Sequence, residues 1–269
     1  MVSFPHCKIN LGLRVIDKRP DGFHNIETCF YPVPWTDVLE VIPAPSFSFA
    51  NTGIAVGGKE ESNLCVRAYR MLQNDFKLPP VAMHLHKIVP MGAGLGGGSS
   101  DAAYTLNMLN HIFALGLQAD ELRHFAAQLG SDCAFFIDKK AMIGTGRGEL
   151  LEEADVSLEG KFLVIVKPDI QIPTAEAYQH VVPNNQHDRI CKIVEGQHLE
   201  NWRHTLVNDF EATVFERHPP IKEIKEVLYA KDALYAAMSG SGSSVFGIFK
   251  SAVDLKQLFD KHTYWSGML

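Results

Sequence analysis

Glycine is concentrated in residues 89–106, VPMGAGLGGGSSDAAYTL, where a glycine-rich loop is followed by two serines and an aspartate. Glycine lets backbone N–H groups approach an anion closely, and successive N–H groups can form a concavity that binds phosphate. Gly92, Gly94 and Gly97 also spell G-x-G-x-x-G, which by itself is a weak indication of dinucleotide binding. The loop therefore indicates phosphate chemistry and leaves open which phosphate it holds.

Several explanations of the glycine run can be compared. In a Rossmann unit an acidic residue binds the ribose, but Asp120 lies beyond a complete helix and is too far along the chain to serve. A Walker P-loop needs a lysine, which is missing before Ser99. A longer glycine loop that wraps a triphosphate and ends at a helix N-terminus fits the residues. The structural alternative is a surface loop, which the regular patterns on both sides disfavour.

The elements that must position this loop follow from hydrophobic periodicity. Strands and helices alternate along the chain, which predicts an α/β or α+β fold with a division near residue 150. Ser99, Ser100 or Asp101 is expected to cap the helix after the loop, and Ser131 or Asp132 to begin another helix. Helices are expected over 61–75, 99–116, 120–130, 219–230 and 254–262, and strands over 4–16, 81–89 and 161–170.

The composition excludes several classes of protein. The net charge is −6 and the pI about 6.0, so a nucleic-acid polymer is a poor candidate partner. Five scattered cysteines without a C-x-x-C pair argue against a disulfide framework or a zinc site. The sequence shows no apolar run of membrane-spanning length and no secretory signal pattern. A cytoplasmic protein with a small anionic ligand is expected.

PMGAGLGGGSSDAA resembles the central motif of the GHMP kinases. Other stretches agree with that family in order: KINLGL, RPDGFHNIET, SNLCVRAYRML, LGSDCAFF, GRGELLE, PDIQIPTAEAY, VNDFE and SGSGSSVFGIF. The triple glycine before Ser-Ser-Asp resembles the branch whose substrate carries a cytidine diphosphate group. The resemblance covers essentially the whole chain and implies a two-lobed GHMP kinase fold. Residues 1–150 would form an ATP-binding, ribosomal-S5-like α/β lobe, and residues 151–269 a ferredoxin-like lobe.

The resemblance implies ATP- and Mg²⁺-dependent phosphorylation of a hydroxyl on a cytidine diphosphate-linked alcohol, a step in making isoprenoid precursors. Asp132 matches the base that accepts the hydroxyl proton, and Lys8 matches the cation that keeps this carboxylate ionised. Asn10 lies on the same strand face as Lys8 and is expected to hydrogen-bond nearby. Taken alone, Asp132 resembles a helix cap and Lys8 a solvated lysine.

The resemblance also implies binding residues. His24 would contact the cytosine edge, Phe23 and Tyr178 would lie against the ring, and Thr174 would contact the substrate from the second lobe. The branch more often has tyrosine at the position of Phe23. The SGSGSSVF segment (239–246) would close over the site and support the first loop, or else be a packed turn. The nucleotide-binding residues would be Asn63, Lys87, Pro90, Met91, Gly92, Ala93, Gly94, Leu95, Gly96, Gly97, Gly98, Ser99, Ser100 and Asp101, with the two serine hydroxyls directed to phosphate or to Mg²⁺.

Three rival functions remain to be compared. A GHMP kinase for a small alcohol such as homoserine or a mevalonate derivative would not need an aromatic pair around a nucleobase. A nucleotide-binding module without catalysis would not need both Lys8 and Asp132. A dinucleotide oxidoreductase would bind NAD(H).

Overall fold

The structure is a computed structural model that describes residues 1–184 and 188–269. It contains two compact units, each built from separated stretches of the chain. The first unit comprises residues 1–7, 35–91 and 96–139, and the second comprises residues 8–34, 92–95 and 140–269. Among the described residues, no helix is both long enough and apolar enough to cross a membrane.

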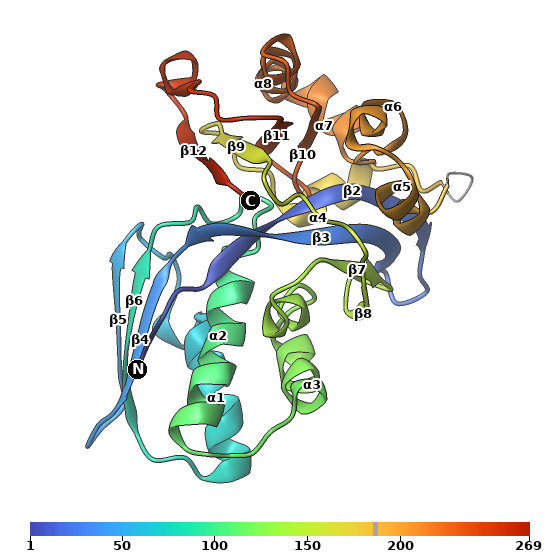
Figure 1. Cartoon of the computed structure of the whole chain (residues 1–269). Helices are drawn as coiled ribbons and strands as arrows, with labels where there is room; N and C mark the ends of the chain where they lie inside the picture. Colours follow the sequence, from blue (N-terminus) through green and yellow to red (C-terminus); the bar gives the residue numbers. More distant parts are fainter. Residues whose placement is uncertain (185–187) are drawn as a thin grey trace. The chain divides into compact units, whose positions relative to one another are not determined.

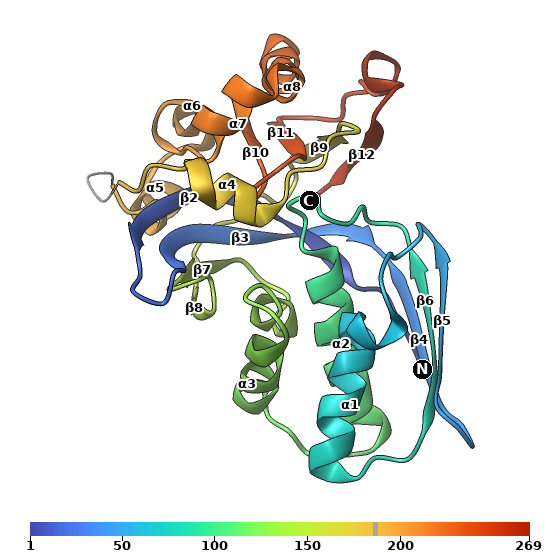
Figure 2. The ribbon, with the colours of Figure 1, turned by 180° about the vertical axis from the view of Figure 1, so that it is seen from behind.

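The first unit combines a four-stranded sheet with helices that lie on one side of it (Figures 1 and 2). The strand order is β1-β4-β6-β5, with β6 antiparallel to β4 and parallel to β5. Helices α1 and α2 pack against each other, and α2 contacts β4. The elements are β1 (Val2–Ser3), β4 (Val38–Pro43), β5 (Ser48–Gly53), η1 (Glu60–Ser62), α1 (Leu64–Phe76), β6 (Val81–Lys87), α2 (Gly97–Ile112), α3 (Ala119–Leu129) and η2 (Ala134–Ile137).

Strand β6 keeps the alternation that its sequence predicts. Val81, Met83 and Leu85 are buried, and so is Lys87, the next residue of the same parity. A charged side chain on the buried face of a strand needs charged or hydrogen-bonding partners, because burial alone disfavours its ionised form. The alternation therefore places an ammonium group inside the first unit, directly before the glycine run.

The second unit contains two sheets and several short helices (Figure 1). One sheet has the order β2-β3-β7-β8, and the other is antiparallel with the order β10-β11-β9-β12. Ile221, Ile224 and Leu228 of α8 share a buried apolar cluster with Val164 and Val245 of the second sheet. The elements are β2 (His6–Lys18), β3 (His24–Thr36), β7 (Met142–Thr145), β8 (Leu150–Glu153), β9 (Phe162–Lys167), α4 (Thr174–His180), α5 (Ile190–Gly196), η3 (Leu199–Asn201), α6 (Trp202–Thr205), α7 (Glu211–Arg217), α8 (Pro219–Ala230), β10 (Tyr235–Met238), β11 (Val245–Phe249), η4 (Lys256–Phe259) and β12 (Thr263–Met268).

The expected mixed α/β class is confirmed, and most of the expected elements are present. The compact units are discontinuous, because residues 8–34 group with the C-terminal part of the chain. The expected lobes, 1–150 and 151–269, were each a continuous stretch of the chain, and this division stays a prediction.

Three local expectations are wrong. Helix α2 begins at Gly97 after the N-cap Gly96, so Ser99, Ser100 and Asp101 lie inside the helix and do not cap it. Residues 131–133 form a turn before the 3₁₀ helix η2, and no α-helix begins there. Residues 254–262 contain one 3₁₀ turn, and β12 follows as an edge strand paired with β9. Strand β12 depends on pairing with the distant strand β9, which local periodicity does not predict.

Candidate active site

The glycine run begins in the second unit, where residues 92–95 pack against the turn after β10. Ser239 Oγ donates a hydrogen bond to Gly94 O at 2.8 Å, and Ser244 N donates to Ala93 O at 3.2 Å. Gly94 has φ +77°, and a Cβ on it would lie 1.9 Å from Ser239 O, so this position requires glycine. The expected support of the first loop by the SGSGSSVF segment is confirmed within this unit. Closure of that segment over a bound substrate stays a prediction.

The VNDFE segment holds this supporting turn. Asn208 Nδ2 donates to Met238 O and to Gly240 O, both at 2.8 Å. Glu211 accepts Met238 N at 2.8 Å and Lys225 Nζ at 2.6 Å. Burial raises the pKa of Glu211, although Lys225 opposes the rise. The motif therefore contributes to the loop through a second layer of hydrogen bonds.

In the first unit, the run ends at the first turn of α2. Gly96 is the N-cap with φ +69°, and a Cβ on Gly97 would lie 2.9 Å from Lys87 Nζ. The first N–H groups of a helix have no partners within the helix, and the helix dipole favours an anion there. Ser100 Oγ is buried without a hydrogen-bond partner among the described residues. These groups fit the phosphates of ATP, for which helix N-termini are ready-made sites.

A buried ion cluster stands behind this helix start. Lys87 Nζ donates to Asp101 Oδ2 at 2.8 Å and also bonds to Asp37 Oδ2. Asp37 Oδ1 accepts the backbone N–H groups of Ile88 at 2.5 Å and Val89 at 2.8 Å. The three charged side chains are at most 2% exposed. The cluster thus ties the end of β6 to the first turns of α2.

The cluster carries two carboxylates and one ammonium. Burial raises the pKa of Asp101 to about 7; Lys87 opposes this rise and the charge of Asp37 adds to it. Burial acts to lower the pKa of Lys87, but the charges of Asp101 and Asp37 outweigh it and raise the pKa. The ammonium group is therefore held in its charged form by its ion pairs with the two carboxylates. Adenine contacts by Lys87 and Asp101 stay predictions.

Two further residues predicted in the first unit are Asn63 and Asp132. Asn63 is the N-cap of α1, and its Oδ1 accepts Cys65 N at 2.9 Å. Asp132 is partly buried in the turn before η2. A purine contact by Asn63 and the role of Asp132 as base stay predictions.

Lys8 and Asn10 lie on β2 in the second unit and are both buried. Lys8 Nζ donates to Asn10 Oδ1 at 2.5 Å and lies 5.3 Å from the ring centroid of Phe30. Asn10 Nδ2 donates to Thr28 Oγ1 at 2.9 Å. The alternative that Lys8 is a solvated surface lysine is wrong, because the hydrogen bond and the neighbouring ring hold it inside the unit. Lys8 and Asp132 belong to different units, and their ion pair stays a prediction.

The predicted cytidine residues also lie in the second unit. The rings of His24 and Tyr178 stack with centroids 4.9 Å apart at 20°, and Tyr178 meets Phe210 edge-on. Burial and the charge of Lys18 lower the pKa of His24. A neutral imidazole offers one donor and one acceptor, which suits the edge of a nucleobase. Contact of these rings with cytosine stays a prediction.

Thr174 and Phe23 complete the predicted acceptor residues. Thr174 begins α4, the helix that also carries Tyr178, and its Oγ1 lies 3.2 Å from Ser241 Oγ in the supporting turn. Phe23 directly precedes His24 and is 54% exposed. The structure therefore brings Thr174, Tyr178 and His24 onto neighbouring positions of one unit.

Two models of known protein families match this chain. The family model described as GHMP kinases N terminal domain matches residues 63–140, and the model described as GHMP kinases C terminal matches residues 192–264. The chain belongs to the GHMP kinase family. This confirms the family expected from the motifs, and the matches span both the glycine run and the SGSGSSVF segment.

Relatives of this GHMP kinase carry a more specific name. Proteins from Cytophaga hutchinsonii and Parabacteroides distasonis, both named 4-diphosphocytidyl-2-C-methyl-D-erythritol kinase, are 51% and 46% identical to it. These alignments cover 93% and 100% of this chain, and the same shares of the two relatives. A crystal structure of 4-(cytidine 5'-diphospho)-2C-methyl-D-erythritol kinase matches with a TM-score of 0.84 and 29% identity over 99% of this chain and 98% of that one. The mevalonate kinase of Methanococcus jannaschii, at 14% identity and TM-score 0.71 over 100% of this chain and 98% of that one, shares the fold alone.

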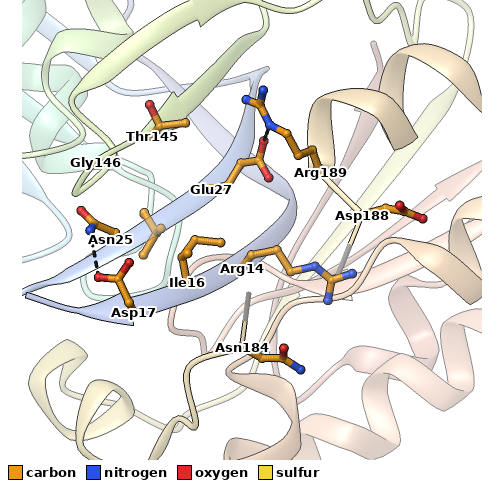
Figure 3. Close-up of a pocket in the computed structure, with 11 residues that line it drawn as sticks. Arg14, Ile16, Asp17, Asn25, Glu27, Thr145, Gly146, Asn184, Asp188 and Arg189 are labelled. Atoms are coloured by element: carbon orange, nitrogen blue, oxygen red, sulfur yellow. Dashed lines mark hydrogen bonds and ion pairs between the residues drawn. The ribbon is translucent and has the colours of Figure 1, made fainter. Parts of the chain in front are cut away.

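A cavity of about 390 Å³ lies in the second unit of this GHMP kinase, between strands β2 and β3 and the segment around Arg189 (Figure 3). Two of its charged groups are paired, since Arg189 Nε donates to Glu27 Oε1 at 3.1 Å. Asp17 accepts a hydrogen bond from Asn25. Three carboxylates and two guanidinium groups line the cavity, so it lacks the excess positive charge that a diphosphate needs.

Sequence reasoning missed Asp37, although one signal pointed to it. The alternation of β6 puts Lys87 on the buried face, and a buried ammonium needs charged or hydrogen-bonding partners. Asp101 is near in sequence, whereas Asp37 is 50 residues away from Lys87 and lies in no glycine-rich or catalytic motif. The need for a partner was visible in the sequence, but the identity of this partner was not.

Proposed function

We propose that this GHMP kinase transfers the γ-phosphoryl group of ATP to the 2-hydroxyl of 4-diphosphocytidyl-2-C-methyl-D-erythritol, in the synthesis of isoprenoid precursors. The observation that carries this proposal is the 51% identity, over 93% of both chains, with a relative of that name. The buried Lys8–Asn10 pair and the stacked rings of His24 and Tyr178 support the proposal, since they would supply a cation and a nucleobase-binding surface. The proposal includes a cytoplasmic location and excludes nucleic-acid polymers and membranes as partners.

At the donor end, the first turn of α2 and the glycine run would bind the phosphates through backbone N–H groups. Mg²⁺ bound to the phosphates would neutralise charge that develops during transfer. Among the described residues, no group of three or more His, Cys, Asp or Glu side chains is placed to hold a metal ion. Mg²⁺ in kinases usually needs one or two protein ligands in addition to phosphate oxygens. The hydroxyls of Ser99 and Ser100, in the first turn of α2, would be the side-chain oxygen ligands next to the loop.

At the acceptor end, Asp132 would take the proton of the attacking hydroxyl. Lys8 would lower the pKa of the attacking hydroxyl. Asn10 fixes the ammonium of Lys8 through the 2.5 Å hydrogen bond. Phosphoryl transfer asks the protein mainly for positioning and charge stabilisation, and these three residues and the loop would supply both together with Mg²⁺.

At the nucleoside end, His24 would contact the edge of cytosine while Phe23 and Tyr178 lie against its ring. Aromatic side chains stack on nucleobases at little entropic cost, because few torsions have to be fixed. Thr174 would contact the same substrate from the start of α4. Recognition of the base would thus come from residues that all belong to the second unit.

The test is ADP release with a panel of alcohols: 4-diphosphocytidyl-2-C-methyl-D-erythritol, the same alcohol without the cytidine diphosphate group, homoserine and mevalonate. Turnover of the first compound alone is expected. Efficient phosphorylation of homoserine or mevalonate would move the function to another GHMP kinase activity. Tight NAD(H) binding without ADP release would contradict the kinase assignment.

A further inference from the structure

Arg147 lies at the tip of the hairpin that joins β7 and β8, in the GRGELLE segment. Gly146 and Gly148 flank it with φ +67° and +106°, which forms a tight turn that other residues would strain. The turn is fixed to β3, because Ile26 N donates to Gly146 O at 2.7 Å. Arg147 is therefore presented from a rigid position, next to the start of β3.

One edge of the Arg147 guanidinium is held by Glu149. Arg147 Nε donates to Glu149 Oε1 at 3.2 Å, and the backbone N of Arg147 donates to Glu149 Oε2 at 2.5 Å. Burial opposes ionisation of Glu149, but hydrogen bonds from the turn and from Arg147 outweigh it and lower the pKa. Within residues 1–184 and 188–269, the two Nη groups of Arg147 make no hydrogen bond. Glu149 therefore orients the guanidinium and leaves its Nη groups able to donate hydrogen bonds to a ligand.

The guanidinium lies over a ring that the proposed function assigns to the substrate. Arg147 Cζ is 5.2 Å from the ring centroid of Phe23, which is 54% exposed and directly precedes His24. Contact with an aromatic face fixes the plane of an arginine and leaves its edge free to donate hydrogen bonds. Phe23 itself has no polar group. Arg147 is thus the cationic donor that accompanies the predicted cytidine residues.

We propose that Arg147 binds the diphosphate of the acceptor substrate through its Nη groups. This inference rests on the proposed function, which places a cytidine diphosphate group against Phe23 and His24. Guanidinium donors match phosphate oxygens in charge and in geometry, and such charge-assisted bonds are stronger than neutral ones. The neighbouring cavity of Figure 3 is a poorer candidate for this diphosphate, because carboxylates outnumber guanidinium groups in its lining.

The test compares Arg147→Gln and Arg147→Lys with the wild type. The control is Arg203→Gln, which removes a guanidinium that lies 4.6 Å over the ring of Tyr229 in the same unit. Calorimetry measures the binding of CDP and of cytidine with saturating ADP in the donor site, and thermal unfolding confirms that each variant is folded. Steady-state kinetics gives KM for the cytidylyl acceptor and for ATP.

Arg147→Gln should weaken CDP binding and raise the KM for the acceptor about tenfold or more, since a charge-assisted hydrogen bond is lost. Cytidine binding and the KM for ATP should not change, and Arg203→Gln should behave as the wild type. The CDP affinity of Arg147→Lys should lie between those of Arg147→Gln and the wild type, because lysine keeps the charge but lacks the planar guanidinium. Unchanged CDP affinity in Arg147→Gln, or equal losses for CDP and cytidine, would overturn the inference. A wild-type enzyme that does not use the cytidylyl acceptor would instead refute the proposed function.

Discussion

The ion cluster behind α2 and the aromatic group around His24 hold their side chains by different means. In the cluster, Lys87 is buried and bonded to two carboxylates. In the aromatic group, Tyr178 stacks on His24 while Phe23 is more than half exposed. Buried, paired charges are costly to disturb, whereas stacked rings at a partly exposed site each contribute little to stability. The first arrangement suits a loop that must keep one shape, and the second would suit the base binding proposed for these rings.

The difference leads to separate expectations for stability and for substrate binding. Changes behind α2 should affect folding first, and changes at the rings should affect the KM for the acceptor alone. Asp132 belongs to neither region, and because its predicted role is proton transfer, its replacement should lower kcat.

Asp132→Asn should lower kcat by about 10²–10⁴, the usual contribution of a positioned general base. Asparagine keeps the shape of the side chain but does not accept a proton at neutral pH. Single-turnover kinetics at saturating ATP measures the chemical step, and ATP affinity should change little. Lys8→Ala is the comparison, since a loss there without a loss in Asp132→Asn would assign the stabilisation to the cation. A decrease of less than about tenfold would mean that Asp132 orients the substrate and does not take its proton.

Lys87→Met should destabilise the fold by about 3–5 kcal/mol, because it leaves two buried carboxylates without their cation. The free energy of unfolding in urea measures this effect. The control is Lys222→Met, which removes an exposed ion pair to Glu226 at 3.6 Å and should cost less than about 1 kcal/mol. Similar small losses for both variants would show that the cluster does not stabilise the start of α2.

His24→Ala and Tyr178→Ala should each raise the KM for the acceptor by roughly twofold to tenfold, the range that corresponds to one aromatic contact. The KM for ATP and the free energy of unfolding should change little by comparison. Tyr264→Ala, which breaks a ring stack with Phe259 in the same unit, is the matched control. If both Michaelis constants rise together, the rings serve the structure and the contrast between the two regions fails.

Much of the fold could be predicted from the sequence, and so could the family. The glycine run needs no distant partner to be recognised, because its backbone freedom is a property of the residues themselves. The alternation of β6 and the apolar face of α1 repeat at short intervals, so each element indicates its own type. The ordered motifs predicted the family, which the two family models confirm. The roles of Lys8 and Asp132 could be predicted in the same way and await the experiments above.

The sequence by itself thus determined the periodic elements and the family, and phosphate binding by the glycine run stays a prediction. Only the tertiary structure decided that Asp37 is the second partner of Lys87, and that Arg147 lies over Phe23. It also decided that residues 263–268 form an edge strand on β9. The physical reason is the same in each case: these contacts join residues far apart in the chain. Burial, sheet pairing and charge compensation select such partners during folding, and no local pattern encodes the selection.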